Sequence, residues 1–267
     1  MKKILAFIVF CTFICAGAVF AEGAKIIDVH GKVTLKQRTS ILWGRAWVDM
    51  ELEKGAQIKT YKNSWCTLAF DDDMKNTLTI RENSQIRLDS LYPVEVNLPK
   101  GRVFALVNEP SKVKEFKIRT PVAVAGVMGT GESVESGNNG TQVWCFDGKL
   151  FIQGVDTQDG QGMSEDFKIL VDAQGNLGVQ LPLSPEDLED WQEFLDYIRG
   201  LLESADTGSK DFGYLGDLIQ EYYSTSEDEL FEQRRRNEET RTEPVDTGGG
   251  DGDGDVDGDG DGETKGW

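Results

Sequence analysis

The densest group of residues able to do ionic chemistry is an alternation of Asp and Gly near the C-terminus. Its acidic members are Asp251, Asp253, Asp255, Asp257, Asp259 and Asp261. Carboxylate oxygens at every second position can converge on one calcium ion when the intervening glycines allow the chain to bend. The first half matches an EF-hand loop with Gly258 at its sixth position, but the twelfth position is Thr264, which carries no carboxylate. The tail is therefore a candidate for looser calcium binding, and a solvated acidic segment is the alternative.

Cys66 and Cys145 are the second group with chemical potential. Each follows a tryptophan in a β-like run, and two thiols exported together can form a disulfide. Such a bridge would close a long loop and stabilise the protein by roughly 4 to 5 kcal/mol. Two buried free thiols are the alternative, because the sequence does not supply the Cα separation that a bridge requires. Neither cysteine has the neighbours typical of a nucleophile or a metal ligand.

The remaining motifs argue against catalysis. The sequence has a single histidine, His30, which is too few for a His-rich metal site. His30 lies on the polar side of a predicted strand, where side chains are solvated. The glycines of residues 126–131 stand in G-x-x-G-x-G order, the reverse of a dinucleotide fingerprint, and no lysine follows to form a phosphate loop. With 47 acidic residues, no pair of carboxylates stands out as a glycosidase pair. We therefore predict a protein without enzymatic activity and without a cofactor other than calcium.

The charge balance of the chain limits the classes of partner that it can bind. The 267 residues include 28 Lys and Arg against 47 Asp and Glu, which gives a formal net charge of -19. This excess repels phosphate backbones, and the longest basic run is Arg234-Arg235-Arg236. We therefore expect no nucleic-acid partner.

The N-terminus predicts export. Lys2 and Lys3 precede an apolar run that ends at Phe20, and small residues stand where a signal peptidase cleaves, before Glu22. Residues 1–21 are thus predicted to be a signal peptide, so the mature protein would be periplasmic or extracellular and would have no membrane span. An uncleaved membrane anchor is the alternative.

The elements that must position these residues are mainly β. Residues 22–154 read as short strands with alternating apolar and polar positions, separated by Gly, Asn and Asp turns. This pattern predicts a domain of many short strands, either a sandwich or a solenoid. Residues 155–183 add two strand candidates, Phe167 to Asp172 and Leu177 to Leu181.

Residues 184–236 predict a helical segment. Ser184 is a helix cap and Asp187 completes a capping-box-like spacing. The apolar positions Leu188, Trp191, Leu195, Ile198 and Leu202 make one stripe. We expect this stripe to pack across an open face or end of the β-domain, with a partner-binding helix as the alternative. Residues 237–267 have too few apolar residues to order a core and predict a disordered acidic tail.

Several short motifs between Asp28 and Gly154 form a recognisable set. They include Gly31-Lys32-Val33, Trp47, Trp65, Asp71-Asp72-Asp73, Glu82-Asn83-Ser84, Gly101, Phe116-Lys117-Ile118-Arg119-Thr120-Pro121 and Ala125-Gly126-Val127-Met128-Gly129-Thr130. Together these motifs resemble the FecR family, named after the envelope regulator of iron-dicitrate uptake in bacteria. The resemblance implies an architectural signature without a catalytic role, and contact with another envelope protein or polymer.

The chain also departs from the family. Members that resemble the regulator carry an N-terminal cytoplasmic segment that binds a sigma factor, whereas here the β-domain directly follows the predicted signal peptide. Met128 stands where the family commonly has Arg, and Gly131-Glu132 replaces a bulkier apolar continuation. We therefore do not expect sigma-factor regulation, and we expect a local difference in this strand.

These observations predict an exported FecR-like module that mediates protein or polymer interactions in the bacterial cell envelope. Exposed strand edges, or aromatic residues such as Trp43 and Trp47, are the expected contact surface. The alternatives are a calcium-responsive extracellular protein that acts through its tail, an envelope signalling component related to iron-uptake regulators, and an enzyme with a scattered site built from acids.

Overall fold

The computed structural model describes residues 23–127, 129–157 and 159–205. They all belong to the first of the two compact units into which the chain divides, Met1–Asp217 and Leu218–Trp267. The elements of the described residues are β1 (Ala24–His30), β2 (Val33–Lys36), β3 (Gly44–Arg45), β4 (Glu51–Leu52), β5 (Gln57–Thr60), β6 (Trp65–Ala69), β7 (Asn76–Ile80), β8 (Gln85–Leu91), β9 (Val94–Val107), α2 (Pro110–Val113), β10 (Phe116–Arg119), β11 (Ala123–Val127), β12 (Thr130–Gly137), β13 (Gly140–Asp147), β14 (Lys149–Gly154), β15 (Gly160–Ser164), β16 (Phe167–Asp172), β17 (Leu181–Pro182) and α3 (Pro185–Ala205).

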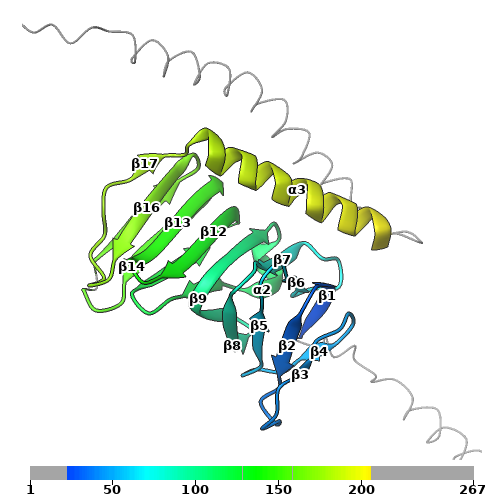
Figure 1. Cartoon of the computed structure of the whole chain (residues 1–267). Helices are drawn as coiled ribbons and strands as arrows, with labels where there is room; N and C mark the ends of the chain where they lie inside the picture. Colours follow the sequence, from blue (N-terminus) through cyan, green and yellow to red (C-terminus); the bar gives the residue numbers. More distant parts are fainter. Residues whose placement is uncertain (1–22, 128, 158, 206–267) are drawn as a thin grey trace, which may run out of the picture. The chain divides into compact units, whose positions relative to one another are not determined.

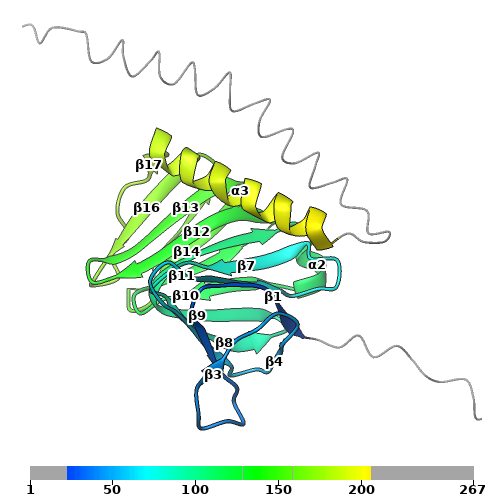
Figure 2. The same ribbon diagram turned by 45° about the vertical axis from the view of Figure 1, so that its right-hand side comes forward.

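The strands form two sheets that share β9, visible as stacked layers in Figures 1 and 2. Sheet A has the order β4-β1-β6-β7-β9-β12-β13-β16-β17. Sheet B has the order β3-β2-β5-β8-β9-β10-β11-β14-β15. Neighbouring strands are antiparallel except β9 and β10, which are parallel. The mainly β fold predicted from the sequence is confirmed, and the chain builds it by crossing repeatedly between the two sheets.

Strand β9 changes from sheet B to sheet A at Gly101. Its first half pairs with β8 and β10, and its second half pairs with β7 and β12. Gly101 has a positive φ of 96°, and a Cβ there would lie 2.2 Å from the Oγ of Ser84. That Oγ accepts a hydrogen bond from the backbone N–H of Arg102 at 3.0 Å. Only glycine fits this turn, which explains its place in the sequence motif.

The inner faces of the two sheets bury one apolar core. In β9, alternate residues belong to this core, first Val94, Val96 and Leu98, then Val103 and Ala105 after the change of sheet. The intervening side chains face outward, as the two-residue repeat of a strand requires. The same alternation places core residues on strands from β1 to β16.

Helix α3 covers the outer face of sheet A, where it appears in yellow in Figures 1 and 2. Ser184 and Asp187 cap its N-terminus: the Ser184 backbone N–H donates to the Asp187 carboxylate at 2.6 Å, and the Asp187 N–H donates to the Ser184 Oγ at 3.3 Å. The stripe residues Leu188, Trp191, Leu195 and Ile198 are buried. The predicted packing of the helix across a face of the β-domain is therefore confirmed.

One strand prediction is wrong. Residues 177–181 do not form a continuous strand, although the neighbouring prediction of Phe167 to Asp172 matches β16. Leu177 makes only an isolated bridge to Val171, and pairing resumes at β17. Between them, the Gly178 N–H donates to the Leu170 carbonyl at 2.9 Å, outside any regular ladder. The apolar alternation of residues 177–181 could not show that they would form so few regular ladder hydrogen bonds with β16.

Candidate interaction surface

The large apolar side chains that are exposed to solvent gather most densely in residues 41–48, which we call the apolar loop. Its exposed members are Ile41 (88%), Leu42 (73%), Trp43 (37%), Trp47 (60%) and Val48 (45%). The loop carries β3, the edge strand of sheet B, and its blue trace projects beyond the strands in Figures 1 and 2. The two tryptophans that the sequence proposed as a contact surface thus lie on the surface and not in the core.

Hydrogen bonds hold the apolar loop in place. At its start, the Ser40 Oγ accepts a hydrogen bond from the Leu42 N–H at 3.1 Å. At its base, the Gln37 side chain donates to the Glu51 carbonyl at 2.7 Å and accepts from the Glu53 N–H at 3.1 Å. Ala46 is buried, and its N–H donates to the Val33 carbonyl at 3.0 Å. The loop is therefore a built feature that presents its apolar side chains to the outside.

Cationic side chains surround the base of the apolar loop. The Lys59 Nζ lies 4.4 Å from the centre of the Trp43 ring, a cation–π contact. Arg45 is exposed on the loop, Arg38 is exposed just before it, and Lys36 lies at the end of β2. Residues 32–62 contain seven Lys and Arg against three Asp and Glu, although the whole chain has a net charge of -19. The loop thus combines apolar and cationic groups in an acidic protein.

The outer face of sheet A is covered by α3 and is closed to solvent. Trp191 stacks on Phe146 with ring centroids 4.5 Å apart, and Phe194 stacks on Phe104 at 4.8 Å. The Tyr197 hydroxyl donates to the Asp28 carboxylate at 2.7 Å, so polar contacts also fasten the helix to sheet A. Burial raises the pKa of Tyr197 above its ordinary value. These groups serve the docking of the helix and are not available to a partner.

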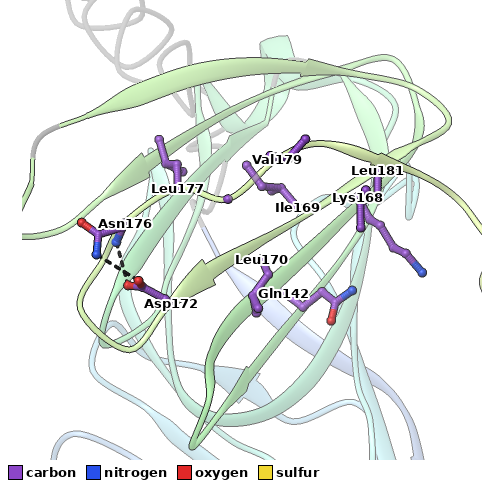
Figure 3. Close-up of a pocket in the computed structure, with 10 residues that line it drawn as sticks. Gln142, Lys168, Ile169, Leu170, Asp172, Asn176, Leu177, Val179 and Leu181 are labelled. Carbon is purple, nitrogen blue, oxygen red and sulfur yellow. Dashed lines mark hydrogen bonds between the residues drawn. The ribbon is translucent and has the colours of Figure 1, made fainter. Parts of the chain in front are cut away.

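A hollow of about 320 Å³ lies at the other edge of sheet A, beside β16 and β17 (Figure 3). Two ionisable residues line it. Asp172 accepts a hydrogen bond from the Asn176 side chain at 2.9 Å, and this bond lowers the pKa of Asp172. Lys168 forms an ion pair with Asp187 at 2.5 Å. Both charged groups are already bound to other side chains of the protein. The surface that the hollow leaves for a ligand is therefore mainly apolar and includes Leu170, Val179 and Leu181.

Of the two alternatives for Cys66 and Cys145, the structure shows the second, because both thiols are free and buried. Cys66 lies on β6 and Cys145 on β13, and β7, β9 and β12 stand between these strands in sheet A. Four strand spacings correspond to roughly 19 Å, far beyond the Cα separation of a bridge. Burial raises the pKa of both thiols, which keeps them protonated and unreactive.

The sequence patterns did not predict that the carboxyl group of Glu132 is buried. Glu132 on β12 is fully buried, and neither of its carboxylate oxygens has a hydrogen-bond partner. Its neighbours across the ladders are Cys145 and Ala105. Burial raises the pKa of Glu132 to about 8. The signal was present, because an acid stands where the family resemblance implies an apolar residue.

The predicted calcium ligands Asp251, Asp253, Asp255, Asp257, Asp259 and Asp261 lie outside the described residues, as do the predicted signal peptide and the segment after residue 205. Within the described part of the chain, no group of three or more His, Cys, Asp and Glu side chains is arranged to hold a metal ion. No helix among the described residues has both the length and the apolar character needed to cross a membrane.

Calcium binding by the tail can be tested directly. We expect calcium to release or absorb heat with the chain that contains residues 251–261 and to give no heat with a chain that ends at residue 250. The reason is that six closely spaced carboxylates provide the hard oxygen ligands that calcium prefers. Isothermal titration calorimetry measures the difference, and equal heats from both chains would contradict the prediction.

The described residues thus form a β-sandwich with one face covered by a helix and an exposed apolar loop at one edge. Residues 56–151 match the family model described as FecR protein, which confirms the resemblance found in the sequence.

Two crystal structures of a proposed anti-sigma factor from Parabacteroides distasonis are similar to the chain, with sequence identities of 16% and 15% and TM-scores of 0.41 and 0.42. Each match covers 51% of this chain and 63% of the other, so the chain spans less than two thirds of those structures. The comparison with curated proteins gave no significant match.

Proposed function

We propose that the chain is a non-enzymatic, exported FecR-like module that binds another component of the bacterial cell envelope. The FecR domain at residues 56–151 supports an envelope role. The N-terminal pattern of residues 1–21 supports export. The reactive side chains that are buried in the fold, Cys66, Cys145 and Glu132, lie inside the core and have no access to a substrate.

The observation that carries the proposal is the exposed apolar loop. Burying one Leu or Ile side chain is worth about 1.5 to 3 kcal/mol, so a fold that fixes several of them outside its core forgoes considerable stability. Exposed apolar groups that are gathered in one place mark an interaction site. The loop is therefore the surface through which we expect the module to bind.

Retention on envelope material tests this function. The chain from Glu22, which contains every described element, is mixed with isolated cell-wall and membrane fractions and sedimented. We expect the protein to sediment with at least one fraction, and the double variant Leu42→Ser/Trp47→Ser to stay largely in the supernatant, because it loses two exposed apolar anchors.

The matched control is Val179→Ser, which removes an even more exposed apolar side chain beside the hollow. This variant should sediment like the unaltered protein. If the unaltered protein stays in the supernatant with every fraction, the proposed function is wrong. If the loop variant and the control are both retained fully, the apolar loop is not the binding surface.

A FecR domain is also compatible with an envelope signalling component. In that role the partner bound by the apolar loop would pass the signal onward. Identification of the bound component by cross-linking and mass spectrometry would distinguish signalling from a structural role.

A further inference from the structure

We propose that the apolar loop inserts into an anionic lipid surface. This inference rests on the proposed function, since it names the envelope component that the loop binds. It would make the protein a peripheral membrane protein held by an apolar tip and a cationic base.

The order of side chains along the loop is the first argument. Ile41 and Leu42 are the most exposed of the large apolar residues of the loop, and they stand next to each other. Trp43 and Trp47 follow closely in the chain. Aliphatic side chains favour the acyl boundary of a bilayer, whereas tryptophan favours the level of the headgroups. The loop therefore matches the polarity profile of a membrane interface.

The charges at the base are the second argument. Arg45 lies on β3 opposite Thr34, and Lys59 lies under the Trp43 ring. Lys36 pairs across the ladder with Gln57, on the neighbouring strand of the same sheet. Cations in this position would meet the phosphate groups while the apolar tip enters the layer, and lysine and arginine near an anionic leaflet add to the attraction. The chain as a whole is strongly acidic and is repelled by an anionic surface. The local excess of positive charge therefore favours an orientation in which the loop faces that surface.

The shape of the loop is the third argument. It projects from the edge of sheet B beyond its neighbouring strands (Figures 1 and 2). A polysaccharide would need hydrogen-bonding groups at the contact, and the side chains of Ile41 and Leu42 have none. A protein partner would have to provide a matching groove. A fluid lipid surface accepts a projecting apolar tip without such a match, so it fits the loop best.

Binding to pure lipid vesicles tests the inference. The chain from Glu22 is used, because the apolar run of residues 1–21 would itself bind lipid. Sedimentation measures binding to vesicles of phosphatidylcholine alone and to vesicles that also contain phosphatidylglycerol. We expect binding to the anionic vesicles that is at least about tenfold tighter than to the neutral ones and that weakens with salt.

Two loop variants and one control separate the contributions. Ile41→Ser/Leu42→Ser should weaken binding to both kinds of vesicle by at least about tenfold, because the apolar tip is lost. Lys36→Gln/Arg45→Gln should remove most of the preference for anionic vesicles. Val179→Ser/Leu181→Ser alters exposed apolar residues at the opposite edge and should bind like the unaltered protein. Circular dichroism and thermal unfolding verify that each variant is folded.

The inference is overturned if the unaltered protein binds neither kind of vesicle, or if Ile41→Ser/Leu42→Ser binds as tightly as the unaltered protein. Retention on envelope fractions together with no binding to pure vesicles would reject the lipid surface and leave the proposed function standing, with a protein or polymer as the partner. Failure to bind both envelope fractions and vesicles would reject both.

Discussion

Replacing Glu132 by glutamine is expected to remove a steep loss of stability between pH 5 and pH 8. The carboxyl group of Glu132 is fully buried without a hydrogen-bond partner, and burial raises its pKa from 4.5 to about 8. The folded protein therefore holds a proton that the unfolded chain releases above pH 4.5. Folding is favoured most when the carboxyl group is protonated in both the folded and the unfolded state, which is the case below pH 4.5.

The expected size follows from the two pKa values. As the pH rises from 4.5 toward 8, the free energy of unfolding falls by about 1.4 kcal/mol for each pH unit, and above the upper value this contribution stays constant. The total loss is on the order of 5 kcal/mol. Glutamine has a similar shape but does not titrate, so the stability of Glu132→Gln should lack this contribution. Its advantage over the unaltered protein should grow as the pH rises.

Urea unfolding followed at pH 5, 6, 7 and 8 measures the effect. The neighbouring thiol of Cys145 does not interfere, because burial raises its pKa and keeps it protonated throughout this range. Glu135→Gln is the matched control, since this exposed carboxylate lies on the same strand. Parallel pH profiles for the unaltered protein and Glu132→Gln would show that Glu132 is ionised or solvated in the fold, contrary to the prediction.

Local sequence patterns predicted the elements that depend on neighbouring residues alone. The strand from Phe167 to Asp172 and the helix start at Ser184 follow from alternation and capping, which are set within a few residues. The same holds for Thr120-Pro121, which directly follows β10. Such features need no knowledge of what lies across the sheet.

Features that depend on distant partners were not predictable in this way. Simple alternation with Val33 and Leu35 would put Ile27 on the core side of the sheet, whereas a register shift between Ile26 and Asp28 makes Ile26 the member of the core cluster. The separation of Cys66 from Cys145 likewise depends on the strand order of sheet A. A β-bulge and a strand order are decided by pairing partners far away in the sequence.

The candidate surface shows the same division. The sequence identified Trp43 and Trp47 as possible contacts, but their hydrophobicity equally suits a core, and only the structure shows that they are exposed. The cationic base was also hidden, because Lys36, Arg45 and Lys59 come together through the pairing of β2 with β3 and β5. A net charge of -19 gave no indication of a local basic region.

Introducing a side chain at Gly131 is expected to force α3 away from sheet A. A Cβ at this position would lie 2.4 Å from Cζ2 and 2.6 Å from Cη2 of Trp191. The indole cannot easily move aside, because it is stacked parallel to Phe146 and also contacts Phe104 and Phe194. The departure from the family pattern at Gly131 thus has a physical reason: the missing side chain makes room for a tryptophan of the covering helix.

We expect Gly131→Ala to lower the free energy of unfolding by about 1 to 3 kcal/mol through overpacking. Trp191→Ala should cost about 3 to 5 kcal/mol, because it removes the largest fully buried side chain of the described residues and leaves a cavity. Gly137→Ala on the same strand is the matched control, since a Cβ there meets no atom within 4 Å. Urea unfolding with tryptophan fluorescence measures all three variants.

A double-variant cycle decides whether the clash with Trp191 is the cause. If the two residues compete for the same space, the cost of Gly131→Ala should largely disappear in the background of Trp191→Ala, because the cavity accommodates the added methyl group. Additive costs would mean that Gly131 is required for the backbone of β12 and not for the helix. The cycle therefore tests whether Gly131 and α3 form one cooperative structure, in which the covered face of sheet A depends on a single missing side chain.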